Sequence, residues 1–239
     1  MIGHPVSGSV GIGRAGRHSN LGAVRVAVLV SGSGTILRAM LDAGVPVAVV
    51  VSDRPCRGLE VAATAGVPAE LADRREWGGF GAGFDRRGFT EAVTRVLVGH
   101  GPDLVAMAGF GTVLDQPVHD AFGGRILNTH PALLPAFPGW RGVEDALAAG
   151  VTVTGCTVHL ATLEMDAGPI LAQQSVPVRP DDTVASLHER IKEVERQLYP
   201  ATVLRAVDEL AATGSLDGLH RQAEPQEDRL REQPEEVRT

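Results

Sequence analysis

The sequence predicts an α/β protein with a doubly wound, mostly parallel, Rossmann-like sheet. Short apolar runs rich in β-branched residues alternate along the chain with segments whose apolar residues recur at helical spacing. Later in the chain this alternation stops, and two strand-like runs follow each other directly, which favours antiparallel strands near the C-terminal end. The length of 239 residues suits one domain of this kind.

The predicted parallel strands are short apolar runs bounded by turn residues, as expected for strands buried on both faces of a sheet. They span residues 24–30, 45–51, 103–109 and 125–128. Between them, helical spacing of apolar residues predicts helices over 36–43, 58–65 and 89–98. Successive strand–helix–strand units of this kind connect by right-handed crossovers.

The last predicted elements are two strands and a helix. Residues 152–161 and 169–178 are interpreted as strands joined by a loop over 162–168. Thr183 can cap a helix whose apolar stripe is formed by Leu187, Ile191, Val194 and Leu198. We expect this helix to end at Pro200, because proline lacks the N–H that a helix interior requires.

We expect a single domain over residues 24–220. The two ends of the chain lack apolar periodicity, which predicts a flexible extension over 1–23 and a flexible charged tail over 221–239. A formal net charge of -7, with no more than two adjacent basic residues, argues against nucleic-acid binding.

Export, membrane insertion and metal binding all lack a signal in the sequence. No apolar run reaches the length of a membrane span or of a signal peptide. The two cysteines, Cys56 and Cys156, have neither disulfide-framework nor metal-ligand spacing. We therefore expect a cytoplasmic protein that has no metal site.

A glycine turn follows the first strand. Ser31-Gly32-Ser33-Gly34-Thr35 leads into a helix, and backbone N–H groups at such a helix start suit a phosphate. The same glycines also fit a tight turn that binds nothing. A dinucleotide site, with Asp53 on the ribose, would need glycine at position 37, where the chain has Leu37. A mononucleotide or sugar phosphate is therefore favoured.

Asn128 and His130 lie at the end of a predicted strand. Side chains alternate along a strand, so these two point the same way and Thr129 points opposite. An amide donor beside an imidazole suits acyl transfer, which needs both an oxyanion donor and a proton carrier. The alternative is a histidine whose hydrogen bonds are satisfied by the backbone.

Asp166 is the second candidate, in a loop before Ala-Gly-Pro. It is either a solvated turn aspartate or a carboxylate that stabilises the imidazolium form of His130. We expect His159 to be a structural partner. No role is assigned to His100, His119 and His188.

The chain resembles the folate-dependent glycinamide ribonucleotide formyltransferases. The resemblance covers about residues 24–213 and rests on motifs in the same order and at similar spacing: VLVSGSGTILRAML, DLVAMAGF, ILNTHPALLPAFPG, TGCTVHLA, MDAGPILAQ and LHERIKEVERQLYP. The Asn-x-His-Pro-x-Leu-Leu-Pro stretch and the later Asp-x-Gly-Pro are the specific ones. The resemblance implies the formyltransferase fold and a formyl group moved from 10-formyltetrahydrofolate to the amine of glycinamide ribonucleotide. It implies neither a metal nor a covalent enzyme intermediate.

The resemblance also implies which residues form the sites. Asn128, His130 and Asp166 form the catalytic set, in which Asn128 and protonated His130 stabilise the oxyanion and Asp166 keeps His130 charged. The glycinamide ribonucleotide contacts are Gly34, Thr35, Ile36, Lys192 and Glu195. The folate contacts are Arg87, Gly111, Thr112, Val113, Leu114 and Asn128, with the Met165 segment over the pteridine.

The chain departs from the family pattern at four places. Ile36 replaces a common asparagine, Thr112 replaces a common basic residue, and Trp140-Arg141 replaces a small residue followed by histidine. Residues 73–87 form a longer, glycine-rich segment. None of these places touches the three catalytic positions.

Three alternatives to this transferase remain at the level of sequence. A formyltetrahydrofolate hydrolase usually carries an N-terminal regulatory domain, for which residues 1–23 are too few. A methionyl-tRNA formyltransferase needs a C-terminal tRNA-binding domain, and about 26 residues remain after 213. A nucleotide-binding module without catalysis would use the glycine turn alone. The sequence leaves the oligomeric state open, a homodimer included.

Overall fold

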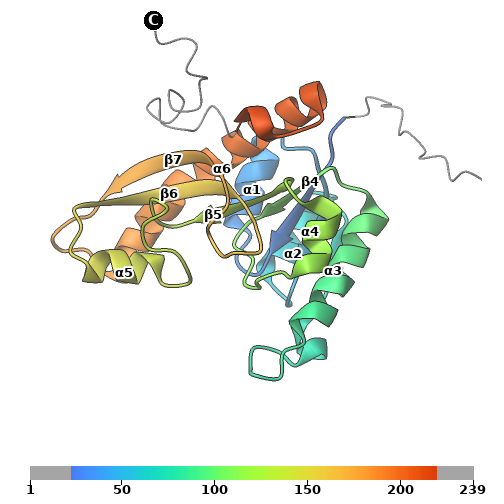
Figure 1. The fold of residues 1–239 in the computed structure, drawn as a ribbon, viewed down its shortest axis with the longest axis horizontal. Helices are drawn as coiled ribbons and strands as arrows, with labels where there is room; N and C mark the ends of the chain where they lie inside the picture. Colours follow the sequence, from blue (N-terminus) through green and yellow to red (C-terminus); the bar gives the residue numbers. More distant parts are fainter. Residues whose placement is uncertain (1–22, 220–239) are drawn as a thin grey trace, which may run out of the picture.

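Seven strands form one sheet in the computed structural model, which describes residues 23–219 (Figure 1). The predicted charged tail and, except for residue 23, the predicted N-terminal extension lie outside these residues. The strands are β1 (Val26–Val30), β2 (Val47–Ser52), β3 (Ala69–Leu71), β4 (Leu104–Met107), β5 (Ile126–His130), β6 (Val153–Leu160) and β7 (Ile170–Pro177). The helices are α1 (Thr35–Asp42), α2 (Arg57–Thr64), α3 (Arg86–His100), α4 (Gln116–Phe122), α5 (Gly142–Ala148) and α6 (Val184–Thr213), with a 3-10 turn, η1 (Arg74–Trp77).

The strand order is β3-β2-β1-β4-β5-β6-β7. The pairs from β3 to β5 are parallel, whereas β5 with β6 and β6 with β7 are antiparallel. This confirms the predicted fold class. The chain continues from β1 to β2 on one side and later places β4 on the other, so the order reverses at β1. In open α/β sheets ligands bind at such a reversal, outside the carboxyl ends of the strands.

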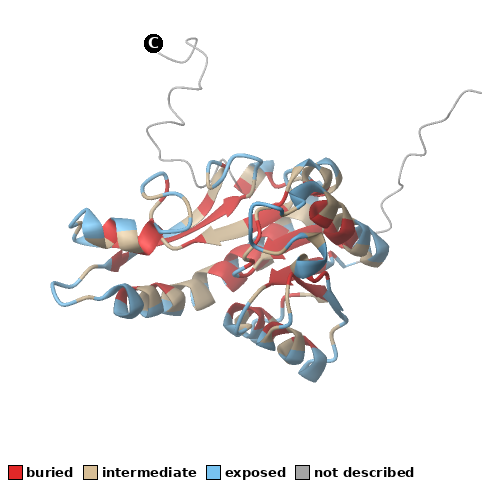
Figure 2. Ribbon diagram, turned by 90° about the horizontal axis from the view of Figure 1, so that it is seen from below, coloured by how far each residue is buried: buried red, intermediate tan, exposed pale blue. Residues whose placement is uncertain are grey.

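The helices cover both faces of the sheet. On β1, Val26 and Val28 face a core shared with α1, α2 and the second half of α6, whereas Ala27 and Leu29 face α3 and α4. A smaller apolar cluster joins α5, β6, β7 and the first half of α6. Buried residues concentrate in the strands and the inward helix faces (Figure 2). β6, β7 and α5 lie at the opposite end of the molecule from α2 and α3 (Figure 1).

The prediction that the last helix ends at Pro200 is wrong. α6 runs for 30 residues and Pro200 lies inside it, buried. Tyr199 is fully buried, and its hydroxyl donates a hydrogen bond to the Leu127 carbonyl at 2.8 Å, while Val203 packs in the same core. This packing on both sides of the proline outweighs the single backbone hydrogen bond that proline removes.

Four short elements were not expected from the sequence: β3, η1, α4 and α5. They have three, four, seven and seven residues, too few for a period of apolar residues to stand out. No helix within residues 23–219 combines the length and the apolar character needed to cross a membrane.

Candidate active site

Two adjoining cavities open at the carboxyl ends of β1, β4 and β5. The larger has a volume of about 350 Å³ and the smaller about 260 Å³. Both are lined by Gly109, Thr129, Pro131 and His188, which therefore form the wall between them. The sheet thus places a paired cavity next to the position where its strand order reverses.

Asn128 and His130 line the larger cavity together with Asp166. β5 supplies the first two, and the loop between β6 and β7 supplies the third. Nδ1 of His130 lies 3.3 Å from Oδ2 of Asp166, and both side chains are almost fully buried. The structure therefore brings together residues that are 36 positions apart in the chain.

The His130 ring has a hydrogen-bond acceptor at each nitrogen. Nε2 lies 2.7 Å from the Phe137 carbonyl, and Nδ1 faces the Asp166 carboxylate. Both acceptors are satisfied together when the ring carries two protons. Gly142, the first residue of α5, leaves room for this arrangement, because a Cβ there would lie 2.9 Å from His130 Nε2.

Asp166 is fixed by its backbone and by its hydrogen bonds. Its φ is 55°, in the left-handed region, which aspartate adopts more readily than most residues. Oδ2 accepts the Gly139 N–H at 2.8 Å. Burial raises the pKa of this carboxyl, but hydrogen bonds from His159 and Gly139 and the charges of His130 and His159 outweigh it, and the pKa lies below its ordinary value. Asp166 is therefore a buried carboxylate, and a solvated turn residue does not describe it.

His159 connects the amide and the carboxylate. It lies directly opposite Asn128 in the antiparallel pair of β5 and β6. Its Nδ1 donates to the Leu160 carbonyl, because that oxygen can only accept. Its Nε2 lies 3.2 Å from Nδ2 of Asn128 and 3.6 Å from Oδ1 of Asp166. His159 thus contacts both groups from β6, and its expected structural role stays a prediction.

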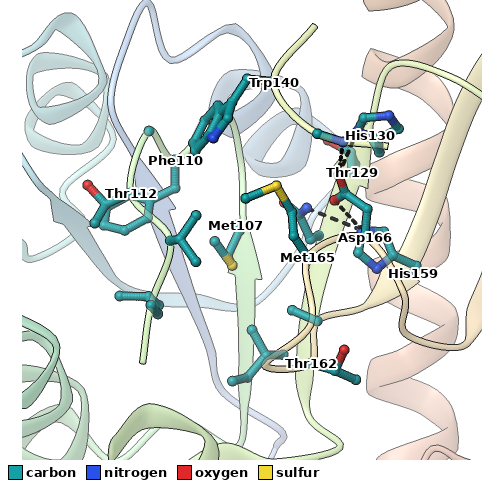
Figure 3. Close-up of a pocket in the computed structure, with 18 of the residues that line it drawn as sticks. Met107, Phe110, Thr112, Thr129, His130, Trp140, His159, Thr162, Met165 and Asp166 are labelled. Carbon is teal, nitrogen blue, oxygen red and sulfur yellow. Dashed lines mark hydrogen bonds and ion pairs between the residues drawn. The ribbon is translucent and has the colours of Figure 1, made fainter. Parts of the chain in front are cut away.

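The rest of the larger cavity is mainly apolar. Trp140 and Phe110 lie on one side, the His130–Asp166–His159 group lies on the other, and Met107 and Met165 lie between them (Figure 3). Trp140 is 70% exposed. A cavity with apolar walls and a few converging polar groups suits a flat ring system that carries a reactive polar centre.

The smaller cavity is lined by the glycine turn and by one face of α6. Gly32, Ser33, Gly34, Thr35 and Ile36 form one side, and His188, Lys192 and Glu195 form the other. Gly34 has φ 71°, and a Cβ there would lie 2.8 Å from the Gly58 Cα, so both conformation and space require glycine. The Ile36 side chain is buried in the core, which leaves its backbone for a ligand.

Glu195 is held from β5. The Thr129 hydroxyl donates to it, which places the Thr129 side chain toward α6. Burial raises the pKa of Glu195, although the Thr129 hydrogen bond and the charges of Lys192 and Arg196 act in the opposite direction. A half-buried carboxylate beside a cation suits a ligand with hydroxyl and amine donors.

The structure brings most of the expected folate contacts to the larger cavity. Its lining includes Gly111, Thr112, Val113 and Leu114. Arg87 is not among the residues that line either cavity, because its side chain is exposed on α3 and pairs with Glu91. Its expected contact with the folate stays a prediction.

Sequence reasoning missed two histidines of the cavity walls. His119 lines the larger cavity and His188 lines both. Burial lowers the pKa of each, and the Lys192 charge adds to this effect at His188. The spacing of His188, Lys192 and Glu195, which is i, i+4 and i+7 on one helix, was the available signal for His188.

Within residues 23–219 no group of three His, Cys, Asp or Glu side chains is placed to hold a metal ion. Cys156 is buried, and burial raises the pKa of its thiol, so it does not present a thiolate.

Residues 24–203 match the family model described as formyl transferase. The chain is 50% identical over 187 residues to the phosphoribosylglycinamide formyltransferase of Mycobacterium tuberculosis, covering 75% of this chain and 83% of that protein. It is 38% identical over 199 residues to the human trifunctional purine biosynthetic protein adenosine-3, covering 80% of this chain and 19% of that much longer protein.

Solved structures agree with these matches. Glycinamide ribonucleotide transformylase 1 from Symbiobacterium toebii has a TM-score of 0.71 at 43% identity, covering 77% of this chain and 88% of that one. Glycinamide ribonucleotide transformylase 1 from Geobacillus kaustophilus has a TM-score of 0.69 at 39% identity, covering 78% of this chain and 99% of that one.

Proposed function

The chain belongs to the formyl transferase family, and we propose that it moves the formyl group of 10-formyltetrahydrofolate to the amine of glycinamide ribonucleotide in purine biosynthesis. The likeness to phosphoribosylglycinamide formyltransferases supports the enzyme class and the acceptor. One observation supports the chemistry: Asn128, His130 and Asp166 converge beside the wall between two cavities, one apolar and one lined by a glycine turn.

The reaction requires charge and proton control at the formyl carbon. Attack by the amine forms a C–N bond and develops negative charge on the formyl oxygen. The Asn128 amide is a donor suited to that charge, and the positive charge of a protonated His130 stabilises it. The ring donates to the formyl oxygen only when its Nε2–H turns from the Phe137 carbonyl to the substrate. The amine loses a proton, and the departing folate nitrogen gains one when its bond to the formyl carbon breaks. His130 is the group placed to relay it.

Asp166 keeps His130 in its working state. A carboxylate at 3.3 Å stabilises the charged form of the ring and orients it. Because hydrogen bonds and nearby charges hold the pKa of Asp166 below its ordinary value, the carboxylate remains ionised near neutral pH. Neither residue needs to form a covalent bond with the substrate.

The two cavities are assigned to the two substrates. The smaller one offers backbone N–H groups at Gly34, Thr35 and Ile36 to the phosphate of glycinamide ribonucleotide. Lys192 and Glu195 line the same cavity and suit the remainder of that substrate. The larger one, along Gly111–Leu114 and beneath Met165, suits the folate ring system.

The deciding assay follows tetrahydrofolate formation by purified protein with 10-formyltetrahydrofolate, with and without glycinamide ribonucleotide. We expect turnover that depends on the amine. Turnover of equal rate without the amine would indicate a hydrolase and overturn the proposal, and absence of turnover in both conditions would indicate a binding module.

The proposal includes one catalytic domain over residues 24–220 in a cytoplasmic enzyme that acts on small molecules. Cell fractionation tests the location. Light scattering on the purified chain decides between a monomer and a homodimer.

A further inference from the structure

A buried polar cluster lies beneath one wall of the larger cavity, at the carboxyl ends of β1 and β2. Asp53, which follows β2, is 0% exposed. Nε of Arg54 donates to Oδ1 of Asp53 at 2.9 Å, and Nη2 of Arg54 donates to Oδ2 at 2.9 Å. The Thr112 hydroxyl also donates to Oδ2, at 2.7 Å. Both carboxylate oxygens of Asp53 thus accept hydrogen bonds from neighbouring residues of the protein. Asp53 is therefore not available to bind the ribose of a dinucleotide.

Arg74, from η1, reaches the same cluster from another side. Its Nη1 donates to the Thr112 hydroxyl at 2.8 Å and to the Gly111 carbonyl at 3.2 Å, and its Nε donates to the Gly79 carbonyl at 2.6 Å. The guanidinium carbon lies 4.2 Å and 4.0 Å from the ring centres of Phe80 and Phe84. These contacts leave Arg74 with little freedom to move.

The cluster fixes the cavity wall at Gly111 and Thr112. The Thr112 hydroxyl donates its proton to Asp53 and accepts a hydrogen bond from Arg74. These two hydrogen bonds fix the orientation of the hydroxyl. The Gly111 N–H donates to the Ser31 hydroxyl at 2.6 Å, while the carbonyl of the same residue accepts from Arg74. Gly111 is therefore held by Ser31, which follows β1, on one side and by Arg74 of η1 on the other.

The electrostatics of the cluster support a fixed geometry. Burial raises the pKa of Asp53, but hydrogen bonds from Arg54, Thr112 and Ser31 outweigh it, so the pKa lies below its ordinary value. A buried carboxylate that is paired with the Arg54 guanidinium and accepts from the Thr112 hydroxyl keeps its charge and its hydrogen-bond directions. Neither Arg74 nor Asp53 lines the cavity.

We propose that Arg74 and Asp53 are positioning residues for the formyl donor: they hold Gly111 and Thr112 in place as the cavity wall and do not contact the donor. This inference rests on the proposed function, because it assigns the larger cavity to the folate. It predicts that weakening the cluster impairs donor binding selectively and leaves the chemistry at His130 intact.

The first variant is Arg74→Lys, which keeps the charge but loses the planar set of donors. We expect KM for 10-formyltetrahydrofolate to rise about tenfold, the size of effect given by one or two lost hydrogen bonds to a charged group. We expect kcat and KM for glycinamide ribonucleotide to stay within about twofold, since the other groups are unmoved. The matched control is Arg75→Lys, the next residue of η1, which is exposed and pairs with Asp73.

Thr112→Val and Thr112→Ser test the hydroxyl itself. Valine should raise KM for the donor as Arg74→Lys does, and serine should restore it. The effects of Arg74→Lys and Thr112→Val should be less than additive in the double variant, because the two substitutions share the Arg74–Thr112 hydrogen bond. Additive effects, or a loss confined to kcat or to thermal stability, would overturn the inference.

Anaerobic calorimetry with tetrahydrofolate separates this inference from the proposed function. If the wild-type protein binds tetrahydrofolate but does not transfer a formyl group, the proposed function fails, and the positioning role stands when Arg74→Lys weakens the Kd about tenfold. If the wild-type protein transfers the formyl group and Arg74→Lys changes neither Kd nor KM, the inference fails and the function stands.

Discussion

The two cavities that meet at the end of β5 are constructed differently. The larger one depends on side chains held by long-range contacts: the Asp166 carboxylate on His130, the His159 ring beside Asn128, and Arg74 beneath the wall. The smaller one presents the backbone of a glycine turn, with α6 opposite. The larger cavity therefore depends on the identity of its side chains. The smaller cavity depends on whether the backbone can adopt the conformation of the glycine turn.

This difference predicts different responses to substitution. In the larger cavity a change at His130 or Asp166 removes a proton carrier or a charge, so the effect should fall on kcat, whereas a change in the cluster beneath the wall should fall on KM for the donor. In the smaller cavity the path of the glycine turn matters most, so a Cβ at Gly34 should weaken substrate binding. The following variants test that division, from the largest expected effect to the smallest.

His130→Ala and Asp166→Ala should have the largest effect. We expect each to lower kcat at least about 10²-fold, because one removes the proton carrier and the other removes the charge that stabilises it. Steady-state kinetics with both substrates measures this, and KM for glycinamide ribonucleotide should change much less. His100→Ala is the control, since His100 lies on α3 and pairs with Glu70. Near-normal turnover in either variant would contradict the catalytic assignment.

Much of the larger site follows from local sequence. The apolar run that leads into Asn128 and His130 predicted a strand end, and strand alternation predicted a shared direction for their side chains. The structure places both on the same cavity. The contact with Asp166 depends on how β6 and β7 pair with β5, and the residues alone left two interpretations of that aspartate open.

The cluster under the cavity wall shows where local reasoning ends. The sequence marked Thr112 and the 73–87 segment as separate departures from the family pattern. Only the tertiary structure joins them, because Arg74 and Thr112 are 38 positions apart and meet through two loops. The course of α6 through Pro200 has a similar cause, since burial of Tyr199 and Val203 decides it. Propensity does not encode such distant packing.

Gly142→Ala should have the next largest effect and tests whether the larger site depends on its supporting backbone. A Cβ there would lie 2.9 Å from both His130 Nε2 and the Phe137 carbonyl, which are hydrogen-bonded to each other. The added Cβ should displace the His130 ring and lower kcat by roughly tenfold to 10²-fold. Residue 142 itself takes no part in the reaction, so the loss would come from the ring position alone. Gly99→Ala is the control, because its Cβ meets nothing within 4 Å. Wild-type kcat in Gly142→Ala would show that the ring position is not critical.

Gly34→Ala tests the backbone-built site. Alanine is strained at φ 71°, and its Cβ would lie 2.8 Å from the Gly58 Cα. The turn should shift, and KM for glycinamide ribonucleotide should rise about tenfold, with KM for the folate nearly unchanged. The variant should also lose thermal stability, which differential scanning calorimetry measures. If kcat falls and KM for glycinamide ribonucleotide stays the same, the assignment of the two cavities is wrong.

Glu195→Gln should have the smallest effect and sharpens the comparison, because Glu195 is a side chain in the cavity where backbone dominates. Its pKa is raised chiefly by burial, so the folded protein holds the proton more tightly than the unfolded chain does. The free energy of unfolding then decreases as pH rises through the interval between the ordinary and the raised pKa, and the cost of the buried charge is fully present above it. Glutamine removes that charge and can still accept from Thr129, so Tm at pH 8 should rise by roughly 2 °C, a gain that shrinks as pH falls.

KM for glycinamide ribonucleotide should rise in the same variant, since a carboxylate that is costly to bury is retained for what it binds. A Tm unchanged at both pH values would show that this carboxylate carries no such cost.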